Sequence, residues 1–181
     1  MFSLCILNTV DLTKLNTSKV KSMKRLFHSC TVKKLDLSLF DTSSVTDMSY
    51  MFDTFECKEL NLDSFNTSKV KTMKGMFVSC KVEKLYLSSF DTSSVRDMHS
   101  MFALSQIKEL NLNNFNTSKV KTMINMFRFC KVEKIDVRSF TEESLQETKA
   151  MFEGCRAQIL YNENNGDKIM KEIIKAGDRR K

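Results

Sequence analysis

Residues 85–102 read LYLSSFDTSSVRDMHSMF, and close variants of this stretch recur along the chain. Its first six residues return as LDLSLF, LNLDSF, LNLNNF and IDVRSF, which begin at Leu35, Leu60, Leu110 and Ile135. The spacing is 25 residues throughout, without an insertion. A fixed period of this length predicts a repeat protein, in which each unit stacks on its neighbours because it cannot bury its apolar side chains alone.

Each unit is expected to contain one strand and one helix. Leu85 and Leu87 alternate with polar residues, which is the pattern of a short strand. Val95, Met98 and Phe102 then follow at the spacing of one helix face, after residue types that cap helix N-termini. The predicted fold class is therefore an α/β repeat: a leucine-rich-repeat-like solenoid with one short parallel strand and one helix per 25-residue unit.

The predicted domain organisation is a single solenoid of about six repeats over residues 1–160, which starts in mid-repeat at MFSLC. Residues 161–181 are expected to form a C-terminal loop, a capping helix and a basic tail, because an open end of a repeat stack needs a cover. The apolar stripe of that helix consists of Ile169, Met170, Ile173 and Ile174.

Composition and motifs argue against an enzyme. The 181 residues, 41 % of them hydrophobic and 28 % charged, can bury a core, and no apolar run reaches the ~18 residues of a membrane span. With four glycines and no proline the chain has no glycine-rich phosphate loop. His28 and His99 are isolated and expected at the surface, and the recurrent Thr–Ser pairs have no neighbouring base. We therefore expect no catalytic residues, no cofactor and no metal site.

Most of the recurring apolar residues are expected to be core, including the methionine and phenylalanine positions. One repeat position holds five of the six cysteines: Cys5, Cys30, Cys80, Cys130 and Cys155. Phe55 and Ser105 occupy it in other units, so we expect a buried slot holding thiols. Stacking would also bring Cys5 near Cys30 and Cys130 near Cys155, within disulfide reach, and this alternative stays open. Metal binding fits poorly, because each unit supplies one ligand and no histidine lies near.

Two exposed surfaces are candidate binding sites. The first is the strand side, with candidate partner-binding residues Asp36, Asn61, Tyr86, Asn111 and Asp136. Residues two positions earlier alternate in sign, namely Lys34, Glu59, Lys84, Glu109 and Lys134, which leaves a nearly neutral face with one aromatic anchor suited to a protein partner. The second is a basic stripe near the expected helix N-termini: Lys19, Lys21, Lys69, Lys71, Arg96, Lys119 and Lys121. With a net charge of +7, the chain could bind nucleic acid or another polyanion there, although no aromatic residues interleave with the lysines.

The unit LxLSxFDTSxVxDMxxMFxxC, as in Leu35–Phe52 and Leu85–Phe102 with Cys30 and Cys80, resembles the BspA-like leucine-rich repeat surface proteins. The resemblance spans roughly residues 1–155. It implies a surface-exposed repeat region, with some members of that family acting as adhesins for host proteins or other cells. The family offers no catalytic residues to transfer to this chain.

Together these observations predict a non-enzymatic protein-interaction or adhesion module that presents a repeat surface to a host or cell-surface protein. The alternative is an intracellular scaffold or polyanion binder that uses the basic stripe. The resemblance implies a cell-surface or secreted protein. This chain carries no recognisable signal peptide, so a cytoplasmic location is the alternative.

Overall fold

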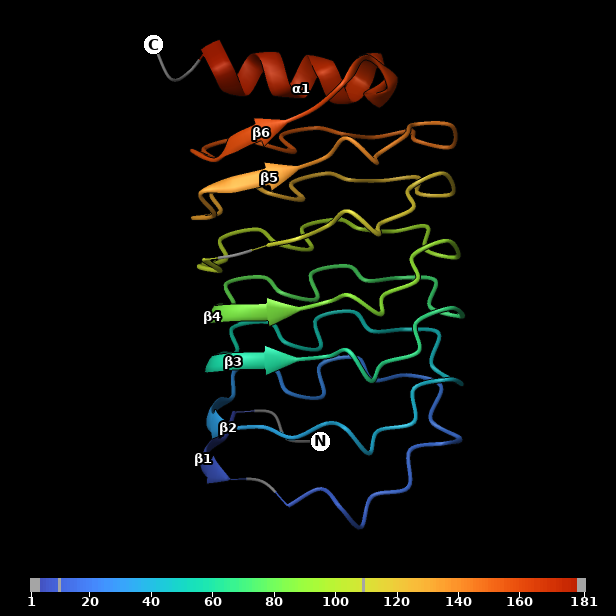
Figure 1. The fold of residues 1–181 in the computed structure, drawn as a ribbon, viewed down its shortest axis with the longest axis vertical. Helices are drawn as coiled ribbons and strands as arrows, with labels where there is room; N and C mark the ends of the chain where they lie inside the picture. Colours follow the sequence, from blue (N-terminus) through green and yellow to red (C-terminus); the bar gives the residue numbers. More distant parts are fainter. Residues whose placement is uncertain (1–3, 10, 109, 179–181) are drawn as a thin grey trace.

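The computed structural model describes residues 4–9, 11–108 and 110–178. The chain forms 25-residue layers, each lying on the one before (Figure 1). We call residues at equivalent positions of successive layers a column. The strands stand on one side of the stack: β1 (Ile6–Thr9), β2 (Thr31–Lys34), β3 (Glu56–Asn61) and β4 (Lys81–Tyr86) form one sheet, and β5 (Lys134–Asp136) pairs with β6 (Gln158–Leu160). A short 3-10 helix, η1 (Glu163–Asn165), and α1 (Asp167–Asp178) follow.

All of these strands pair in parallel, and their register follows the sequence period. Leu60 lies opposite Leu85 and Asn61 opposite Tyr86 in the β3–β4 pair. In the last pair the offset falls by one residue, because Ile135 lies opposite Ile159. The stack therefore keeps its 25-residue register until the layer on which η1 and α1 lie.

The prediction of one helix per unit is wrong, and so is the α/β leucine-rich-repeat-like solenoid that it defined. Within the described part of the chain, α1 is the one α-helix. The expected helix of the second unit is a series of tight turns, in which the N–H of Val45 donates to the carbonyl of Thr42 and that of Met51 to Met48. Turns closed three residues apart return every third side chain to the core, so they reproduce the apolar spacing of a helix.

Bonds between layers replace the bonds that a helix would make within itself. The N–H of Met48 donates to the carbonyl of Thr72 at 3.1 Å, and that of Phe52 to Met76 at 2.9 Å. Tyr50 lies between them with a φ of 57°, a left-handed conformation that interrupts any helix. The same conformation recurs in its column at Arg25, Gly75, Ser100, Asn125 and Ala150. At Gly75 an added Cβ would overlap the ring of Tyr50, so that ring would have to move.

The core is built from columns of identical side chains. Six buried rings stack along the layers, with centroids 5.3–5.8 Å apart and planes within 8° of parallel: Phe27, Phe52, Phe77, Phe102, Phe127 and Phe152. The methionine columns beside them are buried as well, including Met48 and Met73. The prediction that the recurring Met and Phe residues form the core is confirmed.

A column of buried threonines fastens each layer to the next. The hydroxyl of Thr92 donates to the carbonyl of Asn116 at 2.9 Å and accepts from the N–H of the same residue at 2.7 Å. Thr42, Thr67 and Thr117 hold both backbone groups of the residue 24 positions later in the same way. The threonines themselves are buried, and each hydroxyl satisfies one donor and one acceptor of the next layer's backbone in a partly buried place.

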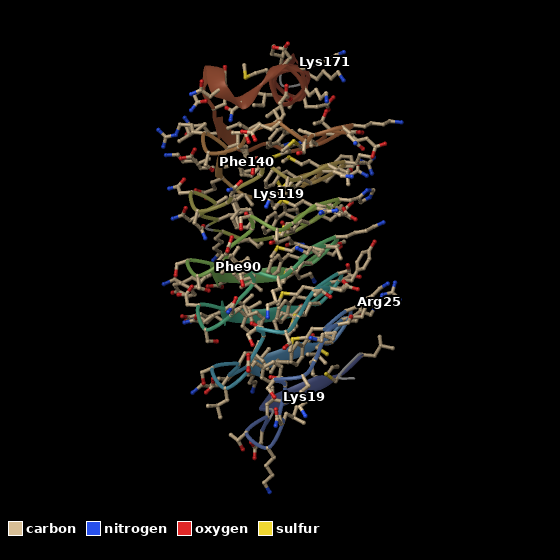
Figure 2. The ribbon with its side chains drawn as sticks, turned by 90° about the vertical axis from the view of Figure 1, so that its right-hand side faces the viewer. Lys19, Arg25, Phe90, Lys119, Phe140 and Lys171 are labelled. Carbon is tan, nitrogen blue, oxygen red and sulfur yellow. The ribbon has the colours of Figure 1, made fainter. Side chains whose placement is uncertain are left out.

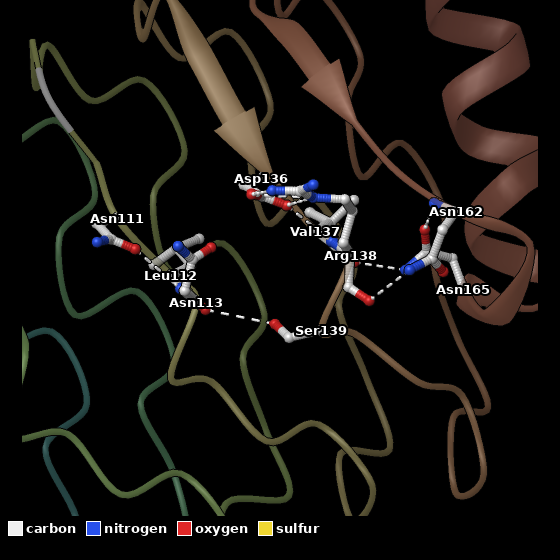
Figure 3. Close-up of polar contacts among 9 residues, drawn as sticks. All are labelled: Asn111, Leu112, Asn113, Asp136, Val137, Arg138, Ser139, Asn162 and Asn165. Atoms are coloured by element: carbon white, nitrogen blue, oxygen red, sulfur yellow. Dashed lines mark hydrogen bonds and ion pairs between the residues drawn. The ribbon is translucent and has the colours of Figure 1, made fainter.

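The C-terminal end of the stack is covered. Asn165, fully buried, donates from Nδ2 to the carbonyls of Val137 and Phe140. In the preceding layer the side chain of Ser139 donates to the carbonyl of Leu112, and Figure 3 shows Ser139 and Asn165 in successive layers. Asn165 therefore continues this series of bonds from a side chain to the backbone of the layer before, although the sequence repeat has ended.

Helix α1 lies across this end of the stack (Figure 1). Ile169, Ile173 and Ala176 are buried beneath it, whereas Ile174 of the predicted stripe is 58 % exposed. The carboxylate of Glu142 accepts from the N–H of Lys168 at 2.9 Å and so caps the first turn. The basic residues 179–181 of the predicted tail lie outside the described residues.

Replacing Thr92 by valine is expected to lower the free energy of unfolding by ~1–3 kcal/mol. Valine keeps the shape but removes the two partly buried bonds to the N–H and the carbonyl of Asn116, each of which contributes ~0.5–1.5 kcal/mol net. Urea unfolding measures the loss. The control is Thr46→Val, which removes one exposed bond and should change stability by less than ~0.5 kcal/mol. Equal effects of the two variants would refute the fastening role.

Replacing the phenylalanine that follows each strand segment, such as Phe90 or Phe140, should show how the packing of the two ends of the stack differs. Phe90 and Phe140 are both buried (Figure 2), so Phe90→Ala and Phe140→Ala should each cost ~3–5 kcal/mol. Leu15 holds the same position in the first described layer and is only half-buried, so Leu15→Ala should cost less than ~2 kcal/mol. A small loss at Phe140, measured by urea unfolding, would show that α1 does not protect the last layers.

Candidate functional site

The strand side presents the candidate partner-binding residues as one column. The structure brings five residues into line along successive layers: Asp36, Asn61, Tyr86, Asn111 and Asp136. Asn61, Tyr86 and Asp136 are the last residues of β3, β4 and β5. All are exposed except Asp136, which is half-buried. The column exists as predicted, but most of its members already have a local partner.

Four of the five side chains close their own turns. Oδ1 of Asp36 accepts from the N–H of Ser38 at 2.9 Å, and Oδ1 of Asn61 accepts from Asp63 at 2.9 Å. Asn111 does the same for Asn113 at 3.0 Å. Asp136 accepts from the N–H of Arg138 and also holds its guanidinium, with an ion pair of 2.7 Å (Figure 3). Turn formation explains the Asp and Asn residues here without any ligand.

Tyr86 is the exception in this column. A tyrosine cannot close the turn as Asp or Asn does, and the N–H of Ser88 donates instead to Oδ1 of Asp63 in the preceding layer, at 2.9 Å. The hydroxyl of Ser88 donates to the same oxygen at 2.7 Å. Asp63 therefore supplies the missing acceptor, and Tyr86, which is 36 % exposed, does not take part in closing the turn.

A shallow hollow of ≈ 520 Å³ adjoins this ring. Its lining includes Lys84, Tyr86, Lys108, Asn111 and Lys134. It lies between β4 and β5, where residues 107, 108, 110 and 111 of the intervening layer form no strand. The hollow is open and broad, which suits contact with another surface better than enclosure of a small molecule.

Charges of opposite sign alternate between layers as predicted, but only some of them form ion pairs. Glu83 and Lys108, one position before the members of the column that begins at Lys34, are paired at 3.5 Å. Glu56 and Lys81, in a further column, are paired at the same distance. Glu109 lies outside the described residues. Exposed pairs of this kind contribute little stability, so the alternation mainly avoids repulsion between stacked like charges.

The basic stripe does not lie at helix N-termini, because the described residues of these layers form no helix. Its members are all exposed side chains on the turn segments: Lys19, Lys21, Lys69, Lys71, Arg96, Lys119 and Lys121. Backbone bonds place Lys71, Arg96 and Lys121 in three successive layers. Lys69 and Lys119 lie near Asp41 and Asp91 of the preceding layers, close enough to help lower the pKa of those carboxyls. The positive charge of Lys69 and Lys119 is thus partly neutralised.

The histidines differ from their prediction as surface residues. His28 is half-buried, and its Nδ1 lies 3.1 Å from a carboxylate oxygen of Asp53. His99 is half-buried too, and burial, together with the charge of Lys74, lowers its pKa. Among the described residues no three His, Cys, Asp or Glu side chains are grouped as a metal site would require. In the same part of the chain no helix is long and apolar enough to cross a membrane.

The layers and the strand-side hollow define a protein of stacked strand-and-turn layers with broad exposed faces. Comparison with protein families matches the family described as "Mycoplasma protein of unknown function, DUF285" over residues 1–84 and 54–165. The chain belongs to that family. A family of unknown function gives no support to an assignment as a leucine-rich-repeat adhesin, and the resemblance to BspA-like proteins stays a prediction. No curated protein and no solved structure matches the chain significantly.

The turn-closing aspartates should make stability depend on acid pH. Bonds from the hydroxyl and N–H of Ser43 lower the pKa of Asp41, and Ser93 acts likewise on Asp91. A lowered folded pKa stabilises the protein above the unfolded value of ~3.9, and that contribution is lost as the pH falls through the folded value. Asparagine keeps the acceptor, as at Asn66, without titrating. Between about pH 5 and pH 3, the double variant Asp41→Asn/Asp91→Asn should therefore lose less stability in urea unfolding than the parent. Parallel losses would contradict this role.

Proposed function

We propose that this protein is a non-enzymatic protein-interaction module whose strand side binds a protein partner around Tyr86. The proposal rests on one observation: the side chain of Tyr86 does not close the turn that follows it. Its neighbours in the column, Asn61 and Asn111, each close a turn, whereas Asp63 closes the turn that follows Tyr86. The side chain of Tyr86 is thus not needed to form its own turn and is available for contact with a partner.

The surroundings of Tyr86 support protein recognition. Tyrosine is enriched at interface positions that carry much of the binding energy, because its ring is large, rigid and able to donate a hydrogen bond. The ring borders the hollow that Asn111 and Lys134 also line. Charges beside it alternate, as in the Glu83–Lys108 pair, so recognition would not rest on one sign of charge.

A second candidate function is polyanion binding by the basic stripe on the turn segments. It is supported by one column of the stripe, in which three successive layers each present a basic side chain: Lys71, Arg96 and Lys121. The nearby carboxylates of Asp47 and Asp97, one column away, reduce the local positive field. Binding there would depend on counterion release and fall steeply with salt.

Exchanging Tyr86 for alanine should weaken the partner complex by ~1–3 kcal/mol, about 5- to 150-fold in Kd. Proteins retained by the immobilised wild-type chain are purified, and their affinities for the variants are measured by calorimetry. Tyr161→Ala is the matched control, because Tyr161 is also exposed and does not line the hollow. Its affinity should equal that of the wild type.

The alternative function is tested in the same series with heparin as the probe. The charge-reversal variant Lys71→Glu/Lys121→Glu should leave the protein complex nearly unchanged at about 50 and 200 mM salt. If Tyr86→Ala has no effect, while charge reversal and high salt abolish binding both to heparin and to the retained partners, the protein is a polyanion binder and the proposal fails.

A further inference from the structure

The cysteine column ends in two pairs of adjacent thiols. Sγ of Cys5 lies 2.6 Å from Sγ of Cys30, and Sγ of Cys130 lies 3.2 Å from Sγ of Cys155. Both separations are shorter than the ~3.5–4.0 Å at which non-bonded carbon atoms rest, and sulfur is the larger atom. The partners of each pair are 25 residues apart and occupy neighbouring layers, whose backbones approach within disulfide reach.

The interior of the same column lacks such a pair. Phe55 stands between Cys30 and Cys80, and Ser105 stands between Cys80 and Cys130. Each gap spans two layers, about 10 Å, which no disulfide bridges. Cys57 belongs to another column, where its thiol donates to the carbonyl of Glu59 at 3.2 Å.

We propose that Cys5–Cys30 and Cys130–Cys155 are two oxidation sites, each of which forms a disulfide that joins neighbouring layers, while Cys57 and Cys80 remain thiols. The bonds would join neighbouring layers near both ends of the described stack. At the N-terminal end they would strengthen a layer that packs less tightly than the next one, because Leu15, Val20 and Leu26 are half-buried whereas their equivalents Phe40, Val45 and Met51 are buried.

The reaction needs an oxidant, for which a small-molecule disulfide such as oxidised glutathione suffices. The thiolate of Cys5 attacks one sulfur of the oxidant and releases one thiolate, which leaves a mixed disulfide on Cys5. The thiolate of Cys30 then attacks the Cys5 sulfur, so that the protein S–S bond forms and the second small thiolate departs. Two electrons pass to the oxidant, and the two protons of the protein thiols pass to the small thiolates.

Burial sets the rates of the two sites. Cys5 is half-exposed, so the first attack at the N-terminal pair needs no opening of the stack, whereas Cys130 and Cys155 are both buried. Burial and then the bond to Cys5 raise the pKa of Cys30 to about 11, so thiolate is scarce at neutral pH. The bond to Cys155, followed by burial, raises the pKa of Cys130. Oxidation should therefore be faster at Cys5–Cys30 and should accelerate at both sites with rising pH.

The experiment incubates the full-length reduced protein with oxidised glutathione, then blocks remaining thiols in denaturant and maps peptides by mass spectrometry. Four of the six cysteines should lose their reactivity, with the loss of two hydrogen atoms per pair and linked peptides joining Cys5 to Cys30 and Cys130 to Cys155. The midpoint of thermal unfolding should rise on oxidation. Cys80→Ser should oxidise like the parent, and Cys5→Ser and Cys130→Ser should each lose one linkage only.

Several results would overturn the proposal. They are six reactive thiols after prolonged incubation with circular dichroism unchanged, stable glutathione adducts in place of linked peptides, or linkages that include Cys57 or Cys80. A linkage at one end only would overturn the assignment of the other pair. Because thiols are counted on the wild-type chain, a variant that fails to fold does not affect the outcome.

Discussion

The rest of the structure depends on hydrogen bonds between backbone groups 24 to 26 residues apart. Segments that would otherwise expose unsatisfied N–H and C=O groups to an apolar interior direct them to the next layer, as Met48 does to Thr72. The threonine column reinforces this register, because each hydroxyl accepts from and donates to the same residue of the following layer. An added residue would move every later side chain out of its column, which explains why the sequence period is so strict. Among the described strand pairs, the one-residue offset occurs in β5–β6, next to the covered end.

The same register decides which surface residues are available for binding. Columns of Asp and Asn recur because each layer needs a side chain to close its turns, at Asp36 on the strand side and at Asp41 on the turn side. A repeated polar residue is therefore weak evidence of a ligand in this fold. Stronger evidence of a binding site is a residue that differs in type from the rest of its column and does not close its turn. Tyr86 is such a residue, because Asp63 closes the turn in its place. The cysteine column follows the same logic, because its departures, Phe55 and Ser105, separate the end pairs from Cys80.

Much of the packing could be predicted from the sequence, and the local backbone could not. The period placed Met48 and Phe52 in the core, where they are buried. Their spacing could not distinguish a helix from successive turns, because both return every third residue to one side. Left-handed residues such as Tyr50 and Ser100 decide between the two, and neither is a glycine that would have signalled the conformation. The strand-side column was found, but the role of Asp63 in freeing Tyr86 depends on a contact across layers that no single unit reveals.

Scalar couplings across hydrogen bonds, measured by NMR on the isotope-labelled protein, test the layer-to-layer register most directly. The structure predicts couplings from the amide of Met48 to the carbonyl of Thr72 and from the amide of Phe52 to that of Met76. The expected helix would instead couple the amide of Phe52 to the carbonyl four residues earlier, at Met48. Couplings across the layers establish the stack as described, and couplings of the helical kind would contradict it.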